Sequence, residues 1–189
     1  MEDILAIFRT SAEVKIRFAE EYAGLISKAA EIISKAFRSG NKLLVFGNGG
    51  SAADAQHIAA EFVNRYLMER APLPAIALTT DSSILTSISN DYSFDDVFAK
   101  QIRALGVRGD IALGITTSGT SPNMLRAFQT SREMGLITIA FTGRDGGPAA
   151  TMVDFNFTVR TDLTPRIQEV HITLAHVICE LVEKRIAQS

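Results

Sequence analysis

A histidine and a glutamate four residues apart form the clearest reactive pair in the sequence. His57 and Glu61 lie in a stretch, residues 52–68, whose pattern predicts a helix. At this spacing two side chains are separated by about 40° around a helix and about 6 Å along it, so they face the same way. Such a pair brings an imidazole and a carboxylate to one metal ion or one substrate. On spacing alone, a surface ion pair is the simpler explanation.

The other two histidines of the chain lie near its C-terminus, in a stretch that is also predicted to be helical. Gln168 and His171 are about one turn apart, whereas Gln168 and His176 are separated by about 80° around the axis and about 12 Å along it. Periodicity therefore leaves His171 and His176 as equal candidates for a site. A buried histidine satisfied by hydrogen bonds is the simpler explanation of either one.

Two short loops have the composition of phosphate-binding loops. Residues 47–51 (GNGGS) stand between an apolar run and a helix, where free N–H groups and the helix dipole favour an anion and glycine permits close approach. A tight turn would also explain this loop. Residues 116–121 (TTSGTS) carry five hydroxyl groups and lead into a helix with Ser121 as N-cap and Pro122 at its first position. Capping uses only one or two hydroxyls, so the second loop favours a phosphate monoester.

The glycine loop also fits the G-x-G-x-x-G/A pattern of dinucleotide-binding proteins, but the match is weak. The acidic residue expected about 20 positions later should end the next strand. Glu69 precedes that strand, however, and Asp81 lies 34 positions after Gly47. No G-K-[ST] follows the loop, which excludes a P-loop.

The scaffold that positions these residues is predicted by apolar runs that alternate with helical stretches. The predicted strands are residues 42–46, 75–78, 111–115, 136–141 and 155–159. Short, continuously apolar strands separated by helices indicate a parallel sheet that is covered on both faces. In such sheets ligands bind at the carboxyl ends of the strands, which is where both loops lie.

Helical periodicity completes the predicted fold. Two helices are expected before the first strand, over residues 4–18 and 25–37, and a final helix over residues 165–186 with Thr164 as its N-cap. No linker or repeat divides the chain. We therefore expect an α/β fold, a three-layer α/β/α sandwich with a five-stranded parallel sheet, formed by residues 1–189 as a single domain.

Composition narrows the classes of partner. The chain has 189 residues, 47% of them hydrophobic, and a net charge of −2, which argues against disorder and against nucleic acid or an anionic membrane as partner. Its longest apolar runs are far shorter than the ~20 residues of a membrane span. The acidic start, Met1-Glu2-Asp3, is unlike a signal peptide, so a cytoplasmic protein is predicted. The single cysteine, Cys179, has apolar neighbours and is predicted to be a core thiol without a chemical role.

Taken in order, these motifs resemble those of the phosphoheptose isomerases, single-domain members of the sugar isomerase (SIS) fold. No single motif is specific, but the ordered set is, and the resemblance covers nearly the whole chain. The motifs are residues 46–51 (FGNGGS), His57-x3-Glu61, Asn90-Asp91, residues 116–121 (TTSGTS), residues 141–147 (FTGRDGG) and residues 166–171 (RIQEVH). Thr116 and Thr120 depart from the common serine and asparagine of the family, although each keeps a polar group.

The resemblance implies an enzyme of the aldose-ketose isomerase class. Such an enzyme interconverts D-sedoheptulose 7-phosphate and D-glycero-D-manno-heptose 7-phosphate through an enediol, at the start of nucleotide-activated heptose synthesis, which can supply lipopolysaccharide core. The implied catalytic residues are Glu61 and His176, with Glu61 as base, and the implied ligands of one zinc ion per subunit are His57, Glu61, Gln168 and His176. The implied substrate-binding residues are Asn48, Gly49, Gly50, Ser51, Glu61, Asn90, Asp91, Thr116, Thr117, Ser118, Ser121 and Gln168.

The resemblance also implies a homotetramer, for which the apolar N-terminal helices offer surface. Because about 12 Å along the helix separates Gln168 from His176, both reach one ion from a straight helix only with difficulty. We therefore expect active sites that share residues between subunits. The expected partners are a sugar phosphate and other copies of the chain, without nucleic acid or membrane.

An alternative of a different class is a non-catalytic regulator, since the same fold serves proteins that bind a replication-initiator protein. A regulator released from catalysis is expected to lose ionisable groups at the catalytic positions. This chain keeps both Glu61 and His176, which favours the enzyme.

Overall fold

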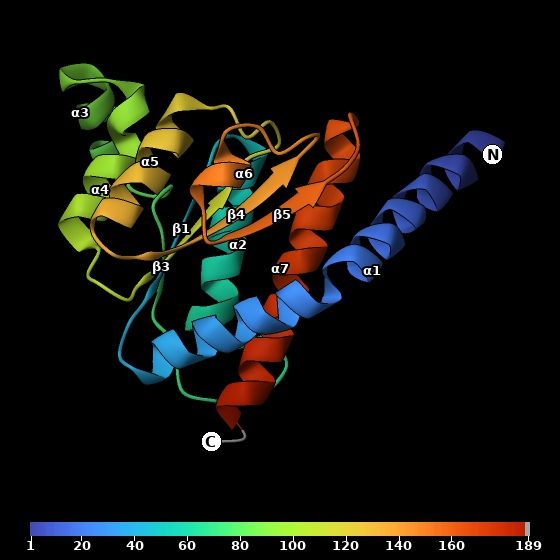
Figure 1. The fold of residues 1–189 in the computed structure, drawn as a ribbon, viewed down its shortest axis with the longest axis horizontal. Coiled ribbons are helices and arrows are strands. Elements are labelled where there is room, and N and C mark those ends of the chain that lie inside the picture. The colour runs from blue at the N-terminus through green and yellow to red at the C-terminus, as the bar shows by residue number, and fades with distance from the viewer. Residues whose placement is uncertain (188–189) are drawn as a thin grey trace.

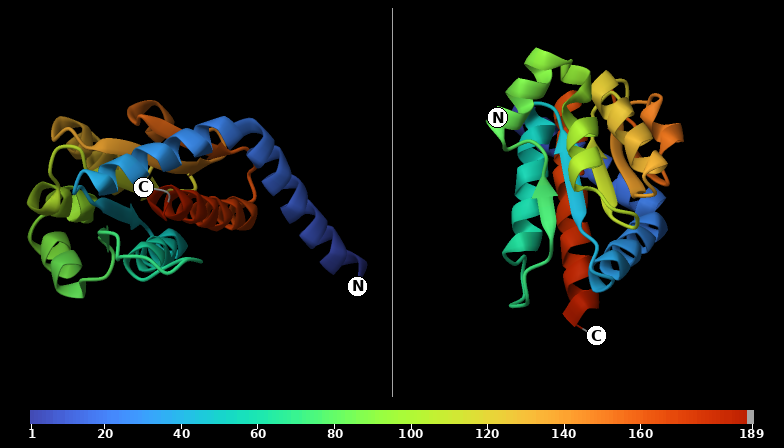
Figure 2. Two further views of the ribbon diagram at one scale, coloured as in Figure 1. Left: turned by 90° about the horizontal axis from the view of Figure 1, so that it is seen from below. Right: turned by 90° about the vertical axis from the view of Figure 1, so that its left-hand side faces the viewer.

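The computed structural model describes residues 1–187 and shows a parallel sheet between two layers of helices (Figures 1 and 2). All strands are parallel, in the order β2-β1-β3-β4-β5. The predicted α/β/α sandwich with a five-stranded parallel sheet is confirmed. The strands are β1 (Leu43–Gly47), β2 (Ala75–Ala77), β3 (Ile111–Ile115), β4 (Ile137–Gly143) and β5 (Phe155–Val159).

The central strands β1, β3 and β4 are buried on both faces, which explains why they read as largely apolar runs. In β1, Leu43 and Val45 point into one hydrophobic cluster, whereas Leu44 and Phe46 point into the other. The first cluster is covered by α1 (Glu2–Arg38), α2 (Gly50–Val63) and α7 (Thr164–Ala187). The second is covered by α3 (Ser82–Asp91), the 3-10 helix η1 (Phe94–Asp96), α4 (Val97–Leu105), α5 (Pro122–Glu133) and α6 (Ala149–Met152).

The prediction of two N-terminal helices is wrong, because α1 is one continuous helix of 37 residues. The expected break lies at Gly24, and an isolated glycine costs a helix interior only about 1 kcal/mol. No proline interrupts the segment, and the residues around Gly24 are good helix formers. The C-terminal part of α1 packs across α7, while its N-terminal part projects from the body of the molecule (Figures 1 and 2).

Helix α2 ends at Val63, five residues earlier than predicted, because a buried carboxylate holds the following backbone in another conformation. Glu183 on α7 accepts hydrogen bonds from the backbone N–H groups of Tyr66, Leu67 and Met68 at 3.0, 2.8 and 2.8 Å. Arg70 lies 3.2 Å from the same carboxylate. Burial raises the pKa of Glu183, but the three N–H donors and Arg70 outweigh it and lower the pKa. The contact fixes the end of α2 against α7.

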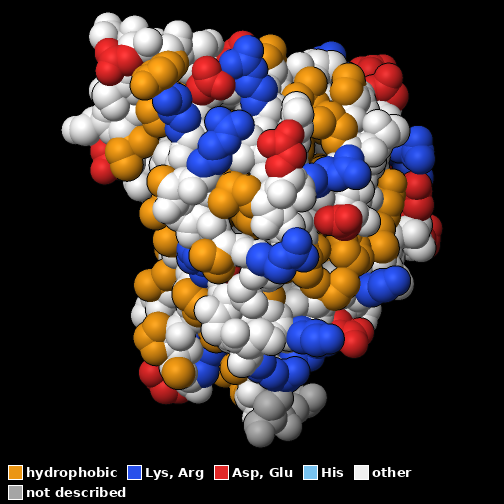
Figure 3. All heavy atoms as spheres, turned by 60° about the vertical axis from the view of Figure 1, so that its left-hand side comes forward, with side chains coloured by type: hydrophobic (Ala, Val, Ile, Leu, Met, Phe, Trp, Pro, Cys, Tyr) orange, Lys and Arg blue, Asp and Glu red, His pale blue; other side chains and the backbone are white. Residues whose placement is uncertain are grey.

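The surface carries charges of both signs, and the single cysteine lies in the core. On the face drawn in Figure 3, basic and acidic side chains are interspersed, with hydrophobic side chains between them. No helix within residues 1–187 is both long enough and apolar enough to cross a bilayer. Cys179 is 1% exposed, and burial raises the pKa of its thiol to about 12, which confirms a core cysteine.

Candidate active site

The two predicted phosphate-binding loops lie side by side at the carboxyl edge of the sheet. From the adjacent strands β1 and β3, the chain continues to β2 on one side and to β4 on the other. Ligands of open parallel sheets bind at such a switch point. A reciprocal pair of amide hydrogen bonds joins the first loop to the start of α5, which follows the second loop, because Asn48 and Asn123 each donate to the other, at 3.0 and 2.8 Å.

Glycine is required in the first loop because neighbouring groups occupy the space of a side chain. A Cβ on Gly47 would lie 2.8 Å from the carbonyl oxygen of Ser51. Gly49, the N-cap of α2, has a φ of 58°, which glycine adopts freely. A Cβ on Gly50 would lie 2.8 Å from the side-chain nitrogen of Gln168, so the loop is shaped to accept this amide from α7.

The hydroxyl groups of the second loop are only partly used by the loop itself. Thr116 accepts a hydrogen bond from the N–H of Gly119 at 3.2 Å, and Ser118 accepts one from the hydroxyl of Thr120 at 2.9 Å. Ser121 occupies the N-cap position of α5 as predicted, but its side chain makes no capping hydrogen bond. Within the described part of the chain the hydroxyls of Thr117 and Ser121 have no partner. Helix capping therefore does not account for this group of hydroxyls.

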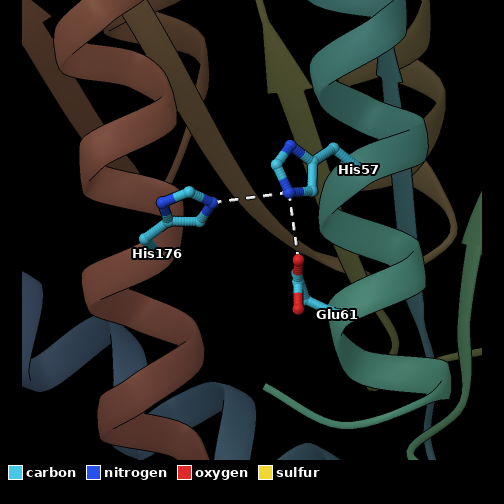
Figure 4. A group of neighbouring side chains, drawn as sticks. All are labelled: His57, Glu61 and His176. Atoms are coloured by element: carbon cyan, nitrogen blue, oxygen red, sulfur yellow. Dashed lines mark hydrogen bonds and ion pairs between the residues drawn. The ribbon is translucent and has the colours of Figure 1, made fainter. Parts of the chain in front are cut away.

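Three side chains from α2 and α7 converge between these helices and form what we call the His-Glu-His group (Figure 4). His57 Nε2 lies 3.0 Å from Glu61 Oε1 and 3.5 Å from His176 Nε2. The possible ligand atoms of all three residues lie within 4.8 Å of one another. The i,i+4 contact between His57 and Glu61 within α2 is thus part of a larger cluster that also includes His176 from α7.

Two of the three separations within the His-Glu-His group are near those expected around a tetrahedral cation. Ligand atoms about 2.0–2.2 Å from a tetrahedral ion lie roughly 3.3–3.6 Å from one another. The separation of the two Nε2 atoms, 3.5 Å, falls in this range, and the 3.0 Å contact between His57 and Glu61 is close to it. Two nitrogens and one carboxylate oxygen are also the donor set of catalytic zinc sites, which leave a position open. The group is therefore a candidate metal site.

The structure separates the two C-terminal histidines, which periodicity could not do. His171 is 1% exposed and packs in the core, with Nε2 2.9 Å from the carbonyl oxygen of Thr142. Burial lowers its pKa to about 4, so the imidazole is neutral near pH 7. His171 is therefore a core histidine that is hydrogen-bonded through Nε2, while its buried Nδ1 has no partner among the described residues. His176, in contrast, lies half-buried against His57.

Three other predicted residues lie outside the His-Glu-His group. Gln168 packs against Gly50 at the start of α2, and a rise of about 12 Å on α7 separates it from His176. Asn90 and Asp91, implied by the resemblance to bind substrate, are the last two residues of α3, where Asn90 donates to Asp91 at 2.9 Å. Both are exposed, and α3 lies at the outer edge of the molecule, away from α7 (Figures 1 and 2).

Two residues at the site escaped the sequence-based reasoning. Asp54 lies on the same face of α2 as His57 and Glu61, because spacings of three and seven residues return to one face of a helix. The pKa of Asp54 is raised, because the effect of burial outweighs the opposing effect of His57 and His176. The ring of Tyr66 lies 5.6 Å from that of His176, between centroids. Helical periodicity would have found Asp54, but the buried contact of Glu183 that places Tyr66 has no signature in the sequence.

Comparison with known proteins gives one consistent answer. A family model described as SIS domain matches residues 7–143. The phosphoheptose isomerase of Aquifex aeolicus (strain VF5) is 56% identical over 188 residues, which cover 100% of this chain and 98% of the relative. That of Geobacter sulfurreducens (strain ATCC 51573 / DSM 12127 / PCA) is 52% identical, and the match covers 98% of each chain.

Solved structures agree with the sequence relatives. The phosphoheptose isomerase of Neisseria gonorrhoeae superposes with a TM-score of 0.91 at 44% identity, covering 97% of this chain and 98% of that one. The phosphoheptose isomerase from Francisella tularensis has a TM-score of 0.93 at 39% identity, and the superposition covers 97% of both chains. The same name thus accompanies full-length similarity in both sequence and fold.

Proposed function

Since this chain belongs to the phosphoheptose isomerase family of SIS-domain proteins, we propose that it interconverts D-sedoheptulose 7-phosphate and D-glycero-D-manno-heptose 7-phosphate. The observation that carries the proposal is the convergence of Glu61 and His176 from two helices, one of which, α2, begins at the glycine loop. We further propose that residues 1–189 act as one domain in the cytoplasm and supply heptose for glycans such as lipopolysaccharide core. The regulator alternative receives no support from the relatives.

The proposed reaction moves a proton between C1 and C2 of the open-chain sugar through an enediol, which requires a base and an acid. One oxygen of Glu61 faces His57, while its second oxygen points away from that contact (Figure 4). We assign the carboxylate of Glu61 as the base and the imidazole of His176 as its partner in acid-base work. His57 orients Glu61 through their 3.0 Å contact.

The phosphate end of the substrate is assigned to the two loops. Thr116, Thr117, Ser118 and Ser121 present hydroxyls from one side, while Asn48, Gly49, Gly50 and Ser51 form the start of α2 on the other. Gln168 lies against Gly50 of the first loop, where its amide is suited to align the sugar chain. The roles proposed for Asn90 and Asp91 rest on the family motif, since within one chain they lie on α3.

We propose zinc as the ion of the His-Glu-His group, one per subunit. His57, Glu61 and His176 supply the donor types and spacing that zinc prefers. As a Lewis acid, zinc supplies polarisation of the carbonyl and hydroxyl oxygens of the substrate. Because His57, Glu61 and His176 lie together within one chain, only Gln168, two helical turns away on α7, would act as a ligand from a second subunit.

We propose a homotetramer whose contacts involve α1. The projecting part of this helix exposes apolar side chains that a monomer leaves in water, namely Ile4, Leu5, Ile7 and Phe8 at 59, 50, 53 and 71%. A groove of about 370 Å³ between α1 and α7, lined by Phe18, Ile26 and Leu174 among others, is also apolar. An unsupported apolar helix beside an apolar groove is suited to association with further copies of the chain.

Phe8→Glu is therefore expected to shift the protein from tetramer to smaller species in sedimentation velocity. Phe8 is 71% exposed within one chain, so the fold of the subunit should persist. Arg9→Glu, also exposed and on α1 but a polar position, serves as the control and should leave the tetramer intact. A parent protein that sediments as a monomer at every concentration would contradict the proposed assembly.

The proposed reaction is tested directly by NMR. Sedoheptulose 7-phosphate incubated with the purified protein is expected to give the signals of the aldose 7-phosphate and, in ²H₂O, deuterium at C2. Incorporation of solvent deuterium distinguishes proton transfer through an enediol from direct hydride transfer. Absence of any aldose, with protein that is folded and loaded with zinc, would refute the proposed substrate.

A further inference from the structure

The turn that follows β4 is built against the hydroxyl loop, residues 116–121. The N–H of Ala149 donates to the carbonyl oxygen of Gly119 at 3.1 Å. A Cβ on Gly119 would lie 2.0 Å from the carbonyl oxygen of Gly146, and one on Gly147 would lie 2.8 Å from that of Ser118. The two loops therefore touch backbone to backbone, so the backbone at the end of β4 has a fixed position relative to the hydroxyl loop.

A cavity of about 490 Å³ opens where these loops meet. Ser118 and Thr120 of the hydroxyl loop line it together with Arg144 and Arg160. Asp145 and Asp162 also line the cavity, so its formal charge is balanced without a ligand. Neither residues 47–51 nor residues 116–121 contain a lysine or an arginine. The cations that accompany the hydroxyl loop in one cavity are thus Arg144 and Arg160.

The backbone of Arg144 has an unusual conformation. Its φ is 61°, and within residues 1–187 it is the only non-glycine residue with a positive φ. Side chains make this conformation unfavourable, and glycine, which adopts it freely, stands at Gly143, Gly146 and Gly147 nearby. Residues held in such conformations cluster at ligand-binding and active sites.

The side chain of Arg144 has no structural task that accounts for this conformation. It is exposed and makes no hydrogen bond or ion pair with any described residue, whereas Arg160 contacts Glu21 at 3.4 Å. Asp145, the neighbouring carboxylate, accepts the N–H of Gly147 at 3.1 Å. An unpaired guanidinium beside loop hydroxyls matches the planar, bidentate recognition of phosphate oxygens.

We propose that Arg144 binds the phosphate group of the substrate and supplies the positive charge that the hydroxyl loop lacks. This inference rests on the proposed function for the identity of the phosphate, but the binding of a phosphate group can be measured without turnover. Arg144 would then be a specificity-determining residue, because it favours a dianionic sugar phosphate over a neutral sugar.

Arg144→Gly tests the proposal, because it removes the guanidinium and relieves the backbone conformation at once. The affinity for inorganic phosphate, measured by titration calorimetry, is expected to fall roughly 10- to 100-fold, and KM for sedoheptulose 7-phosphate to rise by a similar factor. Because the reacting carbons are remote from the phosphate, kcat should change less than threefold. Arg144→Lys should restore part of the affinity, and Arg132→Gln, an exposed arginine on α5, is the control for net charge.

The outcomes separate this inference from the proposed function. If the parent fails to isomerise sedoheptulose 7-phosphate but phosphate affinity still falls in Arg144→Gly, the arginine site stands and the proposed substrate fails. If Arg144→Gly raises thermal stability while phosphate affinity and KM stay at parent values, Arg144 is only a turn residue and the inference is overturned. If phosphate affinity falls while KM is unchanged, Arg144 binds an anion other than the phosphate of the substrate. That result would also overturn the inference.

Discussion

Glu61→Gln is expected to lower kcat roughly 10²–10⁴-fold, because it keeps the shape of the side chain and removes the basic carboxylate. Substrate binding should persist, since the loops at residues 48–51 and 116–121 hold the phosphate end. Stability should change little, because the contact with His57 is partly exposed and an amide oxygen can still accept a hydrogen bond there. Turnover is measured by NMR, and binding by calorimetry with inorganic phosphate.

Two comparisons make this experiment decisive. Glu69→Gln, at an exposed glutamate beyond the end of α2, makes the same chemical change outside the site and should leave kcat unchanged. Zinc content must be measured on Glu61→Gln itself: lower turnover with zinc retained identifies the base, and lower turnover with zinc lost identifies Glu61 as an essential ligand. A variant that isomerises the substrate at the parent rate would refute the mechanism.

Replacing both histidines of the His-Glu-His group is expected to abolish zinc binding. His57→Ala with His176→Ala removes two of three ligands within the chain, and zinc affinity should fall by well over 100-fold, since even a residue that merely supports a ligand contributes 10- to 100-fold. Turnover should fall with it, while circular dichroism should remain that of the parent because neither histidine is in the core. Elemental analysis after dialysis is the measurement, and about one zinc per subunit is expected for the parent protein.

Cys179→Ala is the control for zinc binding, because a cysteine thiolate can also bind zinc. Cys179 lies in the core with a pKa raised to about 12, so it is a poor zinc ligand, and Cys179→Ala should retain the metal. Stoichiometric zinc in the double histidine variant would show that the metal lies elsewhere. Activity of the parent that survives complete removal of zinc by a chelator would show that the residues work without it.

The sequence determined the layered fold because its signals are local. The strands are short and mainly apolar, and the helices repeat their apolar residues at helical spacing. Both patterns can be read within a few neighbouring residues. Boundaries were predicted less well where a distant contact decides them. Helix α2 stops at Val63 because Glu183, 120 residues later, captures the N–H groups of residues 66–68. Likewise, a glycine such as Gly24 often marks the end of a helix, yet α1 continues through it.

The candidate site divides in the same way. The four-residue spacing of His57 and Glu61 was enough to predict that they lie on the same face of α2, because both belong to one helix. The choice between His171 and His176 depends on how α7 is rotated against α2 and the sheet, which is a property of packing between distant segments. Only the tertiary structure turned His171 into the core, at 2.9 Å from the carbonyl oxygen of Thr142, and His176 toward His57, at 3.5 Å. Side-chain burial, which residue spacing alone does not contain, separates these two otherwise equivalent histidines.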